Sequence, residues 1–470
     1  MNMFYNREKE IQQIHDVVGM KNGKSKGILV WGIRRSGKST LIKEAMKDFD
    51  GNFINFECAI VSFEKNMEML ASACAEETGL GYLAYITDFS NLMKLLDQSG
   101  KDTVILLDEY QFIKNGYRDG NFDSFVQIAL DSLSDRITII LCGSYVSVMR
   151  RLQEYSAPLY GRFSLAIELQ PFNYYESSMF YSALSPRDKI AFYSVFGGLP
   201  FVLSQLVPEK GLEWNVKHLL LEKSSSVYIV LTETVLREIF KIEKAQEILY
   251  AIGNGKKRNR DLSSCLNVTS SVIADECQRL CDMAILEKEV PINVKDDKKK
   301  TFYSIKDNLL RFFYAYILPN ASAISRFGAD YVWSKIEDGV KTFISRRFEG
   351  VVTEFVTLCM KNSGTIDALD VGTYWYDTKD ENIGYDVVIR QKRGYFIISC
   401  KYLASEMRKS LEDEELSKMQ NAKEMVLSGC GFATADGYEN DDKAILRLTG
   451  SDYYSPEEIK TGGKLKKFLG

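Results

Sequence analysis

The chain has 470 residues, of which 45% are hydrophobic and 26% charged, with a formal net charge of −4 and a pI near 5.7. This composition is ordinary for globular proteins, and the length allows about three or four domains. The acidic balance excludes a protein that coats nucleic acid over its whole surface. Since no signal-peptide core and no apolar run near the ~20 residues of a membrane helix are found, we expect a cytoplasmic protein with no membrane partner.

Helical and strand-like segments alternate through the first 172 residues. Short apolar runs predict buried strands at 27–31, 52–56, 103–107, 137–142 and 164–169. Helical patterns begin near residue 6 and recur at 41–46, 63–98 and 124–132. This alternation predicts an α/β domain with a parallel sheet, whose ligand lies at the carboxyl ends of the strands.

The segment after the first strand has the spacing G-x-x-x-x-G-K-S from Gly32 to Ser39. In such a loop, backbone N–H groups surround a polyphosphate, Lys38 reaches its β and γ oxygens, and the Ser39 hydroxyl binds Mg²⁺. The alternative is a glycine-containing turn that matches the motif by chance. The strand before the loop and the helix after it disfavour this alternative. We therefore predict a site for ATP and Mg²⁺. Its cofactor-binding residues are Gly32, Arg34, Arg35, Ser36, Gly37, Lys38, Ser39 and Thr40.

Two further strands end in polar residues that suit the same site. Asp108 and Glu109 follow the strand at 103–107, where an acidic residue can hold Mg²⁺ and the next can polarise the attacking water. A solvated strand end is the alternative, which the P-loop about seventy residues earlier disfavours. Ser144 follows the strand at 137–142 and is either a sensor of the γ-phosphate or part of an ordinary turn.

The pattern of predicted elements changes in residues 241–325. Helices are predicted at 245–252, 261–265 and 270–283, followed by a hairpin of 284–290 and 301–305 with the loop Lys295–Lys300. Three helices and a hairpin with a basic tip predict a winged helix, which could bind double-stranded DNA. The basic run Lys256–Arg260 supports DNA, whereas Asp275 and Glu276 on the second short helix favour a protein contact or a lid.

Several segments together resemble the archaeal-type ATPases, a branch of the AAA+-like, signal-transducing P-loop ATPases. These segments are Phe4–Glu10, Gly32–Thr40, Leu106–Gln111, Cys142–Ser144, Pro158–Arg162, Phe196–Pro200 and Tyr303–Phe313. The resemblance implies a helical lid after the ATPase core and, in one subgroup, a C-terminal restriction-endonuclease-like domain. It also implies that Arg162 stabilises charge during catalysis, beside Lys38, Glu109 and Ser144. A surface arginine at the start of a strand is the alternative for Arg162.

The last 145 or so residues, 326–470, contain a candidate nuclease-like site. A four-residue hairpin loop pairs residue 390 with 395 and therefore 386 with 399, so that Asp386, Ser399 and Lys401 share a face. Restriction-type nucleases place two carboxylates and a lysine there, and Glu349 on the preceding helix could contribute. Because Ser399 replaces the second acid, we expect weakened or lost cleavage, with a fold kept for structure or binding as the favoured alternative.

The sequence thus predicts an α/β protein of four parts. These are a P-loop ATPase domain (1–172), a helical lid (173–240), a winged-helix domain (241–325) and a restriction-endonuclease-like domain (326–470). The expected function is binding and Mg²⁺-dependent hydrolysis of ATP in association with DNA. A nucleotide-gated signalling switch that controls assembly with a protein partner or a homo-oligomer is the alternative.

Overall fold

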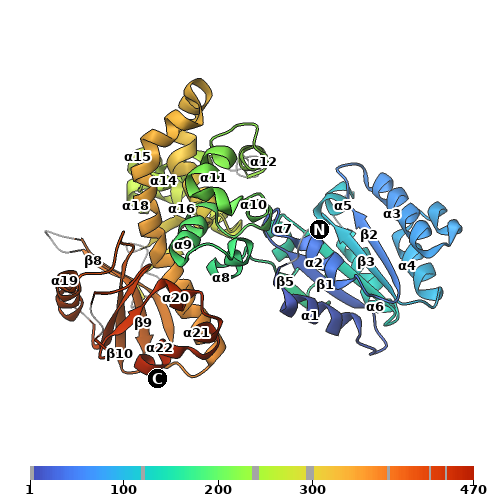
Figure 1. Ribbon diagram of the computed structural model, residues 1–470. Helices are drawn as coiled ribbons and strands as arrows, with labels where there is room; N and C mark the ends of the chain where they lie inside the picture. Colours follow the sequence, from blue (N-terminus) through green and yellow to red (C-terminus); the bar gives the residue numbers. More distant parts are fainter. Residues whose placement is uncertain are drawn as a thin grey trace. The chain divides into compact units, whose positions relative to one another are not determined.

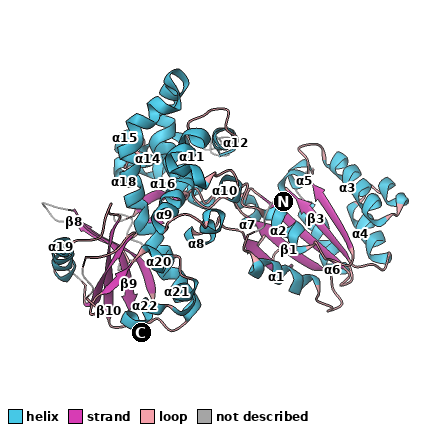
Figure 2. Cartoon of the chain, in the orientation of Figure 1, coloured by secondary structure: helices cyan, strands magenta, loops and turns pink. Residues whose placement is uncertain are grey.

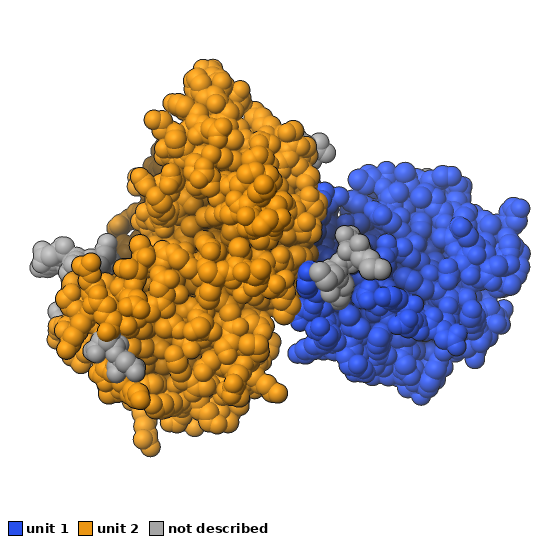
Figure 3. All heavy atoms as spheres, viewed as in Figure 1, with its two compact units in different colours: residues 1–171 blue, residues 172–470 orange. Residues whose placement is uncertain are grey.

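The computed structural model describes residues 5–117, 122–235, 243–292, 301–377, 382–422, 425–439 and 442–470. The chain divides into two compact units, Met1–Pro171 and Phe172–Gly470 (Figure 3). The start of the segment Phe4–Glu10 and the loop Lys295–Lys300 lie outside the described residues. Among the helices described, none combines the length and the apolar character needed to span a membrane.

Unit 1 is built on a five-stranded, wholly parallel sheet (Figure 1). In spatial order its strands are β2 (Asn52–Glu57), β3 (Thr103–Asp108), β4 (Ile137–Gly143), β1 (Lys26–Trp31) and β5 (Phe163–Glu168). The three central strands are buried along their whole length, as their uninterrupted apolar sequences predict. The predicted α/β fold with a parallel sheet is therefore confirmed.

Helices cover both faces of this sheet (Figure 2). They are α1 (Glu8–Val18), α2 (Lys38–Ala45), α3 (Phe63–Thr78), α4 (Phe89–Gln98), α5 (Gln111–Gly116), α6 (Phe122–Ser132) and α7 (Val146–Arg151). Residues 63–98, predicted as one helical stretch, form two helices with a 3-10 turn at Gly81–Tyr85 between them. The break follows from Gly79, which ends α3 at φ 73°, and from Asp88, whose side chain caps α4.

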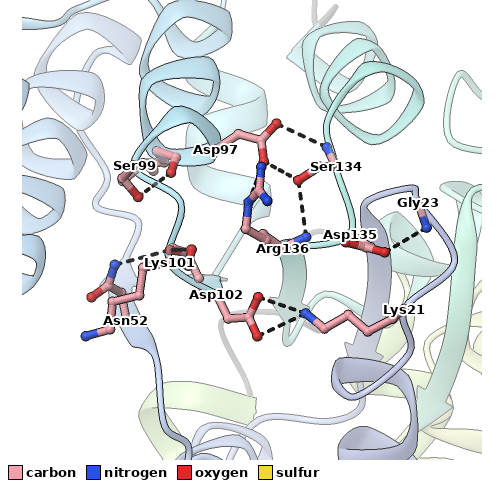
Figure 4. A network of polar contacts seen from close by, with 12 residues as sticks. Lys21, Gly23, Asn52, Asp97, Ser99, Lys101, Asp102, Ser134, Asp135 and Arg136 are labelled. Carbon is pink, nitrogen blue, oxygen red and sulfur yellow. Dashed lines mark hydrogen bonds and ion pairs between the residues drawn. The ribbon is translucent and has the colours of Figure 1, made fainter.

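Polar contacts hold the amino edge of the sheet, where the strands begin (Figure 4). The Lys21 ammonium lies 2.8 Å from the carboxylate of Asp102, the residue before β3. The backbone N–H of Ser134, just before β4, donates to the carboxylate of Asp97 at 3.1 Å. These contacts connect the loops at this edge, whereas the loops that carry the predicted nucleotide site lie at the opposite, carboxyl edge.

Unit 2 begins with short helices and continues into a module of three helices and a hairpin. The first helices are α8 (Tyr174–Ser177), α9 (Pro186–Phe196), α10 (Pro200–Leu203), α11 (Gly211–Leu220) and α12 (Ser226–Ile229). The helix–hairpin module consists of α14 (Ala245–Gly253), α15 (Asn259–Leu266), α16 (Ser270–Asp282) and the antiparallel strands β6 (Leu286–Glu289) and β7 (Phe302–Ile305). The short helices from α9 to α12, this module, α17 (Asn308–Phe312) and the start of α18 share one apolar core.

A mixed sheet forms the C-terminal part of unit 2. Its order is β12 (Leu446–Leu448), β11 (Leu427–Thr434), β10 (Gly394–Lys401), β9 (Asn382–Gln391) and β8 (Asp370–Asp377). Strands β8 to β10 are antiparallel and β10 to β12 parallel. Tyr395 pairs with Arg390, the register that the hairpin loop predicted.

Helices cover both faces of the C-terminal sheet as well. One face packs on the long helix α18 (Ala321–Ser363), which is broken at Gly328, and on α20 (Gly450–Tyr453), α21 (Pro456–Thr461) and α22 (Gly463–Leu469). The other face packs on α19 (Lys409–Gln420). We refer to α18 together with this sheet and its later helices as the C-terminal domain.

Candidate functional site

The predicted P-loop connects the carboxyl end of β1 to the first turn of α2 (Figure 1). Gly32 has φ 157°, and a Cβ at this position would lie 2.3 Å from the backbone oxygen of Leu169. Gly37, with φ 89°, precedes α2 in the left-handed region. Both positions therefore require glycine, one for close backbone approach and one for its positive φ.

Inside the loop, the Lys38 side chain is folded back onto the backbone. Only 6% of the residue is exposed, and its ammonium donates to the carbonyl oxygens of Gly32 and Ile33, each at 3.0 Å. The Ser36 hydroxyl is buried and has no hydrogen-bond partner among the described residues. The ammonium of Lys38 thus lies against the backbone of the loop, the place from which a P-loop lysine reaches the β- and γ-phosphates.

Ser39 and Asp108 meet at the carboxyl edge of the sheet. The Ser39 hydroxyl donates to one carboxylate oxygen of Asp108, and the other accepts from the backbone N–H of Glu109 at 2.9 Å. This donor set fits Mg²⁺, which binds proteins through one or two oxygen ligands and completes its shell with water and substrate phosphate. Within the described residues, no group of three or more His, Cys, Asp or Glu side chains could hold a metal ion.

Two neighbours hold the Glu109 carboxylate. Its Oε2 accepts from the Ser144 hydroxyl at 2.8 Å and from the side-chain amide of Gln111. Gln111 is fully buried, and its Oε1 has no hydrogen-bond partner in the described part of the chain. The structure therefore brings the predicted residues Glu109 and Ser144 together. Gln111 was not predicted as a site residue, although its place two residues after Glu109 is a signal that could have identified it.

The remaining residues predicted for the ATP site are not part of the Ser39–Asp108 or Glu109–Ser144 pairs that the structure shows. Arg34, Arg35 and Thr40 are exposed on the loop and on α2. Arg162 precedes Phe163, which pairs with Gly27 at the start of β1, so it lies at the amino edge of the sheet. Its guanidinium donates to Asp131 at 3.2 Å and to the backbone oxygen of Tyr160 at 2.9 Å. The length of β1, about 16 Å at ~3.3 Å per residue, separates Arg162 from the P-loop of its own chain.

The C-terminal domain assembles a second set of charged side chains around β9 and β10. Asp386 accepts from the backbone N–H of Cys400 at 2.8 Å. Glu415, from α19, accepts from the Ser399 hydroxyl at 2.9 Å and lies 3.0 Å from the Lys401 ammonium. Glu415 was not predicted, because it belongs to a later helix and no local spacing connects it to the hairpin.

Burial and charge shift the pKa values of these carboxyl groups. Burial, and next the negative charge of Asp386, raise the pKa of Glu349 on α18 to about 7. Burial also raises the pKa of Asp386, although a backbone N–H and Lys401 oppose this. Burial would raise the pKa of Glu415 too, but hydrogen bonds from Lys401 and Lys418 outweigh it and lower that pKa. Asp386 thus interacts electrostatically with the other two predicted residues, Glu349 and Lys401.

The basic run of the helix–hairpin module is only partly available to a ligand. Burial lowers the pKa of Lys257, and the guanidinium of Arg258 lies 5.0 Å from the ring centroid of Phe302 in β7. Lys256 and Arg260 are exposed. Of the four basic residues in this run, two therefore take part in packing and two face solvent.

Comparisons with known proteins agree with this architecture. Residues 4–206 match the family described as an ATPase domain predominantly from Archaea, and residues 313–415 match a family of archaeal and bacterial proteins of unknown function. An uncharacterized protein of Methanocaldococcus jannaschii is 22% identical over 431 residues, which cover 89% of this chain and 90% of that protein.

Two solved structures are among the matches to this chain. A Walker-type ATPase of Pyrococcus abyssi has a TM-score of 0.50 and 18% identity, covering 66% of this chain and 96% of its own. The ORC2 protein of Aeropyrum pernix, solved as ADPNP–ADP complexes, has a TM-score of 0.45 and 13% identity, covering 69% of this chain and 97% of its own.

Proposed function

We propose that this chain, which carries an ATPase domain of the family found predominantly in Archaea, binds ATP with Mg²⁺ and hydrolyses it in association with DNA. One observation carries the proposal. The P-loop lysine Lys38, the Ser39–Asp108 pair and the Glu109 carboxylate held by Ser144 all lie at the carboxyl edge of a single parallel sheet. Open α/β sheets bind their ligands at this edge.

Each residue has a separate role in the proposed reaction. The N–H groups of the loop and the Lys38 ammonium bind the β- and γ-phosphates, while Ser39 and Asp108 would hold Mg²⁺, whose charge would offset that of the phosphates. Glu109 accepts a proton from the water that attacks the γ-phosphorus, and the bond from phosphorus to the β–γ bridging oxygen breaks. Ser144, which already donates to Glu109, orients that carboxylate.

Two substitutions test the ATP site. We expect Lys38→Ala to abolish ATP binding, and Glu109→Gln to bind ATP but hydrolyse it about two to four orders of magnitude more slowly, because the water loses its proton acceptor. Binding is measured by titration with labelled ATP and hydrolysis by phosphate release. Glu57→Gln is the matched control. Glu57 is an exposed carboxylate at the end of β2, in backbone register with Asp108 at the end of β3. Wild-type hydrolysis by Glu109→Gln would remove Glu109 from the mechanism.

In this proposal the helix–hairpin module acts as a winged helix on double-stranded DNA. The order of three helices and a hairpin supports it, as do the exposed Lys256 and Arg260. The predicted wing lysines 298–300 would add phosphate contacts, although they lie outside the described residues. The C-terminal domain is nuclease-like in the same proposal, and Ser399 by itself would leave it with weakened or lost cleavage.

A nucleotide-gated switch that controls assembly with a protein partner is the second candidate function. It is favoured by α16, the helix that would face DNA in a winged helix, because Asp275 and Asp282 are exposed on it. Carboxylates on that surface repel phosphates. A switch would bind ATP with the same residues, but its turnover would not respond to DNA.

A further inference from the structure

We propose that Lys257, Arg311 and Arg347 form a binding site for a phosphate group, where the helix–hairpin module meets the C-terminal domain. We refer to these three residues as the seam cluster. They come from the loop before α15, from α17 and from α18. The proposal goes beyond the ATPase function and does not depend on it, since all three residues belong to unit 2.

Helix α18 places Arg347 between the two apolar cores of unit 2, along which it runs (Figure 1). Ile344 is the last buried residue of this helix in the core that contains the module. Phe348 is its first buried residue in the core of the C-terminal domain. Arg347 is within one helical turn of both. It therefore lies at the point along α18 where one core ends and the other begins.

The hairpin of the module holds the other two members of the seam cluster. The backbone carbonyl of Lys257 accepts from the N–H of Tyr303 in β7 at 2.9 Å. The Arg311 guanidinium donates to Glu287 in β6 at 2.7 Å and to the Ser304 hydroxyl in β7 at 3.3 Å. All three members of the cluster are partly buried. Loop, hairpin and two helices thus bring three cations from distant parts of the sequence to one place.

The three cations lie close enough to act on one another. Burial lowers the pKa of Lys257, and the positive charges of Arg347 and Arg311 act in the same direction. Burial, and next the charge of Arg311, lower the pKa of Arg347 to about 10. Cations that are partly removed from water beside other cations are unfavourable unless anions compensate them. An anion bound among them would remove this repulsion.

Nearby carboxylates offset the charge but leave many N–H donors without acceptors. Glu289 on β6 and Glu349 on α18 both interact electrostatically with the seam cluster. The side chains of Lys257 and Arg347 nevertheless have no hydrogen bond or ion pair within the described part of the chain. The Nε of Arg311 is buried and also has no hydrogen-bond partner there. Since an ammonium has three N–H donors and a guanidinium five, the cluster lacks acceptor oxygens above all.

A phosphate group would supply these oxygens. Guanidinium groups bind phosphate through two parallel hydrogen bonds, and an ammonium binds it as a point charge. Two guanidinium groups and one ammonium from separate elements would surround one phosphate. The group could belong to a free compound, such as pyrophosphate, or to the strand of a nucleic acid, and the two sources are separated by experiment.

The test measures the binding of inorganic pyrophosphate to the full chain by isothermal titration calorimetry. All proteins carry Lys38→Ala, so that the P-loop contributes little. We expect Arg347→Gln and Lys257→Gln each to weaken binding about tenfold or more, because each removes hydrogen bonds between charged groups. Arg347→Lys keeps the charge without the planar donors and should weaken binding less. Arg346→Gln is the matched control, because Arg346 is the preceding residue of α18 and is exposed.

A 5′-phosphorylated oligonucleotide, followed by fluorescence anisotropy, distinguishes the two sources. Weaker pyrophosphate binding in Arg347→Gln supports a site for free phosphate compounds, and weaker oligonucleotide binding alone supports a site for nucleic acid. The proposal is overturned if neither ligand binds, or if Arg347→Gln and Lys257→Gln bind both as tightly as the Arg346→Gln control. The seam cluster would then be a hydrated charge network that joins the two cores. Circular dichroism confirms folding, and Lys257→Gln and Arg347→Lys give the same comparison if Arg347→Gln does not fold.

Discussion

Glu109 has a backbone conformation that few residues other than glycine adopt, with φ 51°. The conformation turns the chain sharply at the end of β3 and directs the side chain toward Ser144, which follows directly after the neighbouring strand β4. The fully buried Gln111 contacts the same carboxylate from the start of α5. A side chain held by a strained backbone and two hydrogen bonds is positioned before substrate arrives, which is what a proton acceptor needs.

Gln111 should therefore act on turnover rather than on ATP affinity. In Gln111→Leu the Glu109 carboxylate loses one of its two donors, and we expect kcat to fall about ten- to a hundredfold with little change in KM for ATP. Steady-state kinetics measure both constants. Gln111→Glu would place a second carboxylate beside Glu109 and should be slower still, because like charges repel. A raised KM with unchanged kcat would mean that Gln111 supports nucleotide binding instead.

At this scale, the residues that could be predicted are those with a local signal. Gly32, Lys38 and Ser39 follow from spacing within one loop, and Asp108 follows from its place at the end of an apolar run. Glu415 could not be predicted, because its contacts with Ser399 and Lys401 depend on α19 folding back onto β10. The position of Arg162 was predictable in principle, since a residue that begins a parallel strand lies at the edge opposite the P-loop.

Among the elements, α18 carries a buried carboxylate at the centre of unit 2. Glu354 accepts from the backbone N–H of Tyr174 at 3.0 Å and from the Tyr193 hydroxyl at 2.8 Å. Burial raises the pKa of Glu354 to about 7, although both hydrogen bonds oppose the shift. The carboxyl group thus ties α18 to α8 and α9, while burial favours its protonated form.

This shift makes the stability of unit 2 depend on pH. The folded state binds the Glu354 proton more tightly than the unfolded state, so the free energy of unfolding falls as pH rises from about 4.5 to about 7 and then stays level. In Glu354→Gln the residue cannot ionise. Relative to the wild type, we expect this variant to gain about 3 kcal/mol between pH 5 and pH 8, at ~1.4 kcal/mol per pKa unit.

Urea unfolding at several pH values, followed by the fluorescence of the three tryptophans of unit 2, measures this difference. They are Trp214, Trp333 and Trp375. Glu337→Gln is a suitable control, because Glu337 is an exposed glutamate on the same helix. If the free energy of unfolding changed with pH in the same way for the wild type and for Glu354→Gln, Glu354 would not be the source of the pH dependence.

Element types were easier to predict than the surfaces that they present. The helices and hairpin of the helix–hairpin module follow from their hydrophobic patterns, and the C-terminal hairpin register follows from its loop length. The orientation of the basic run could not be predicted in the same way. Lys257 turns inward and Arg258 lies over Phe302, because β7 returns beside this loop from a distant part of the sequence.

On the scale of the whole molecule, the helix–hairpin module and the C-terminal sheet belong to one unit and are in direct contact. The rings of Phe302 in β7 and Trp375 in β8 stack with centroids 4.5 Å apart. The backbone N–H of Ile292 donates to the carbonyl of Thr373 at 2.9 Å. DNA bound by the module would therefore be held on the same unit as the C-terminal sheet.

Binding of DNA through the module should depend steeply on salt. Because each phosphate contact contributes a log–log slope of about −0.9, neutralising two contacts in Lys256→Gln/Arg260→Gln should flatten the slope by about 2. Fluorescence anisotropy with labelled duplex at several salt concentrations measures it. Lys460→Gln is the control, since Lys460 is exposed on α21 outside the module. An unchanged slope, or no duplex binding by the wild type near 50 mM salt, would leave the module as a protein contact.

The rate of ATP hydrolysis by the full chain, with and without duplex DNA, tests the central claim most directly. The proposed function predicts Mg²⁺-dependent hydrolysis that duplex DNA stimulates several-fold in the wild type, less in Lys256→Gln/Arg260→Gln, and not at all in Glu109→Gln. Hydrolysis at the same rate with and without DNA would contradict a DNA-linked ATPase and favour the switch. No hydrolysis by folded wild-type protein under either condition would contradict the assignment of Glu109 and Lys38 to a working catalytic site.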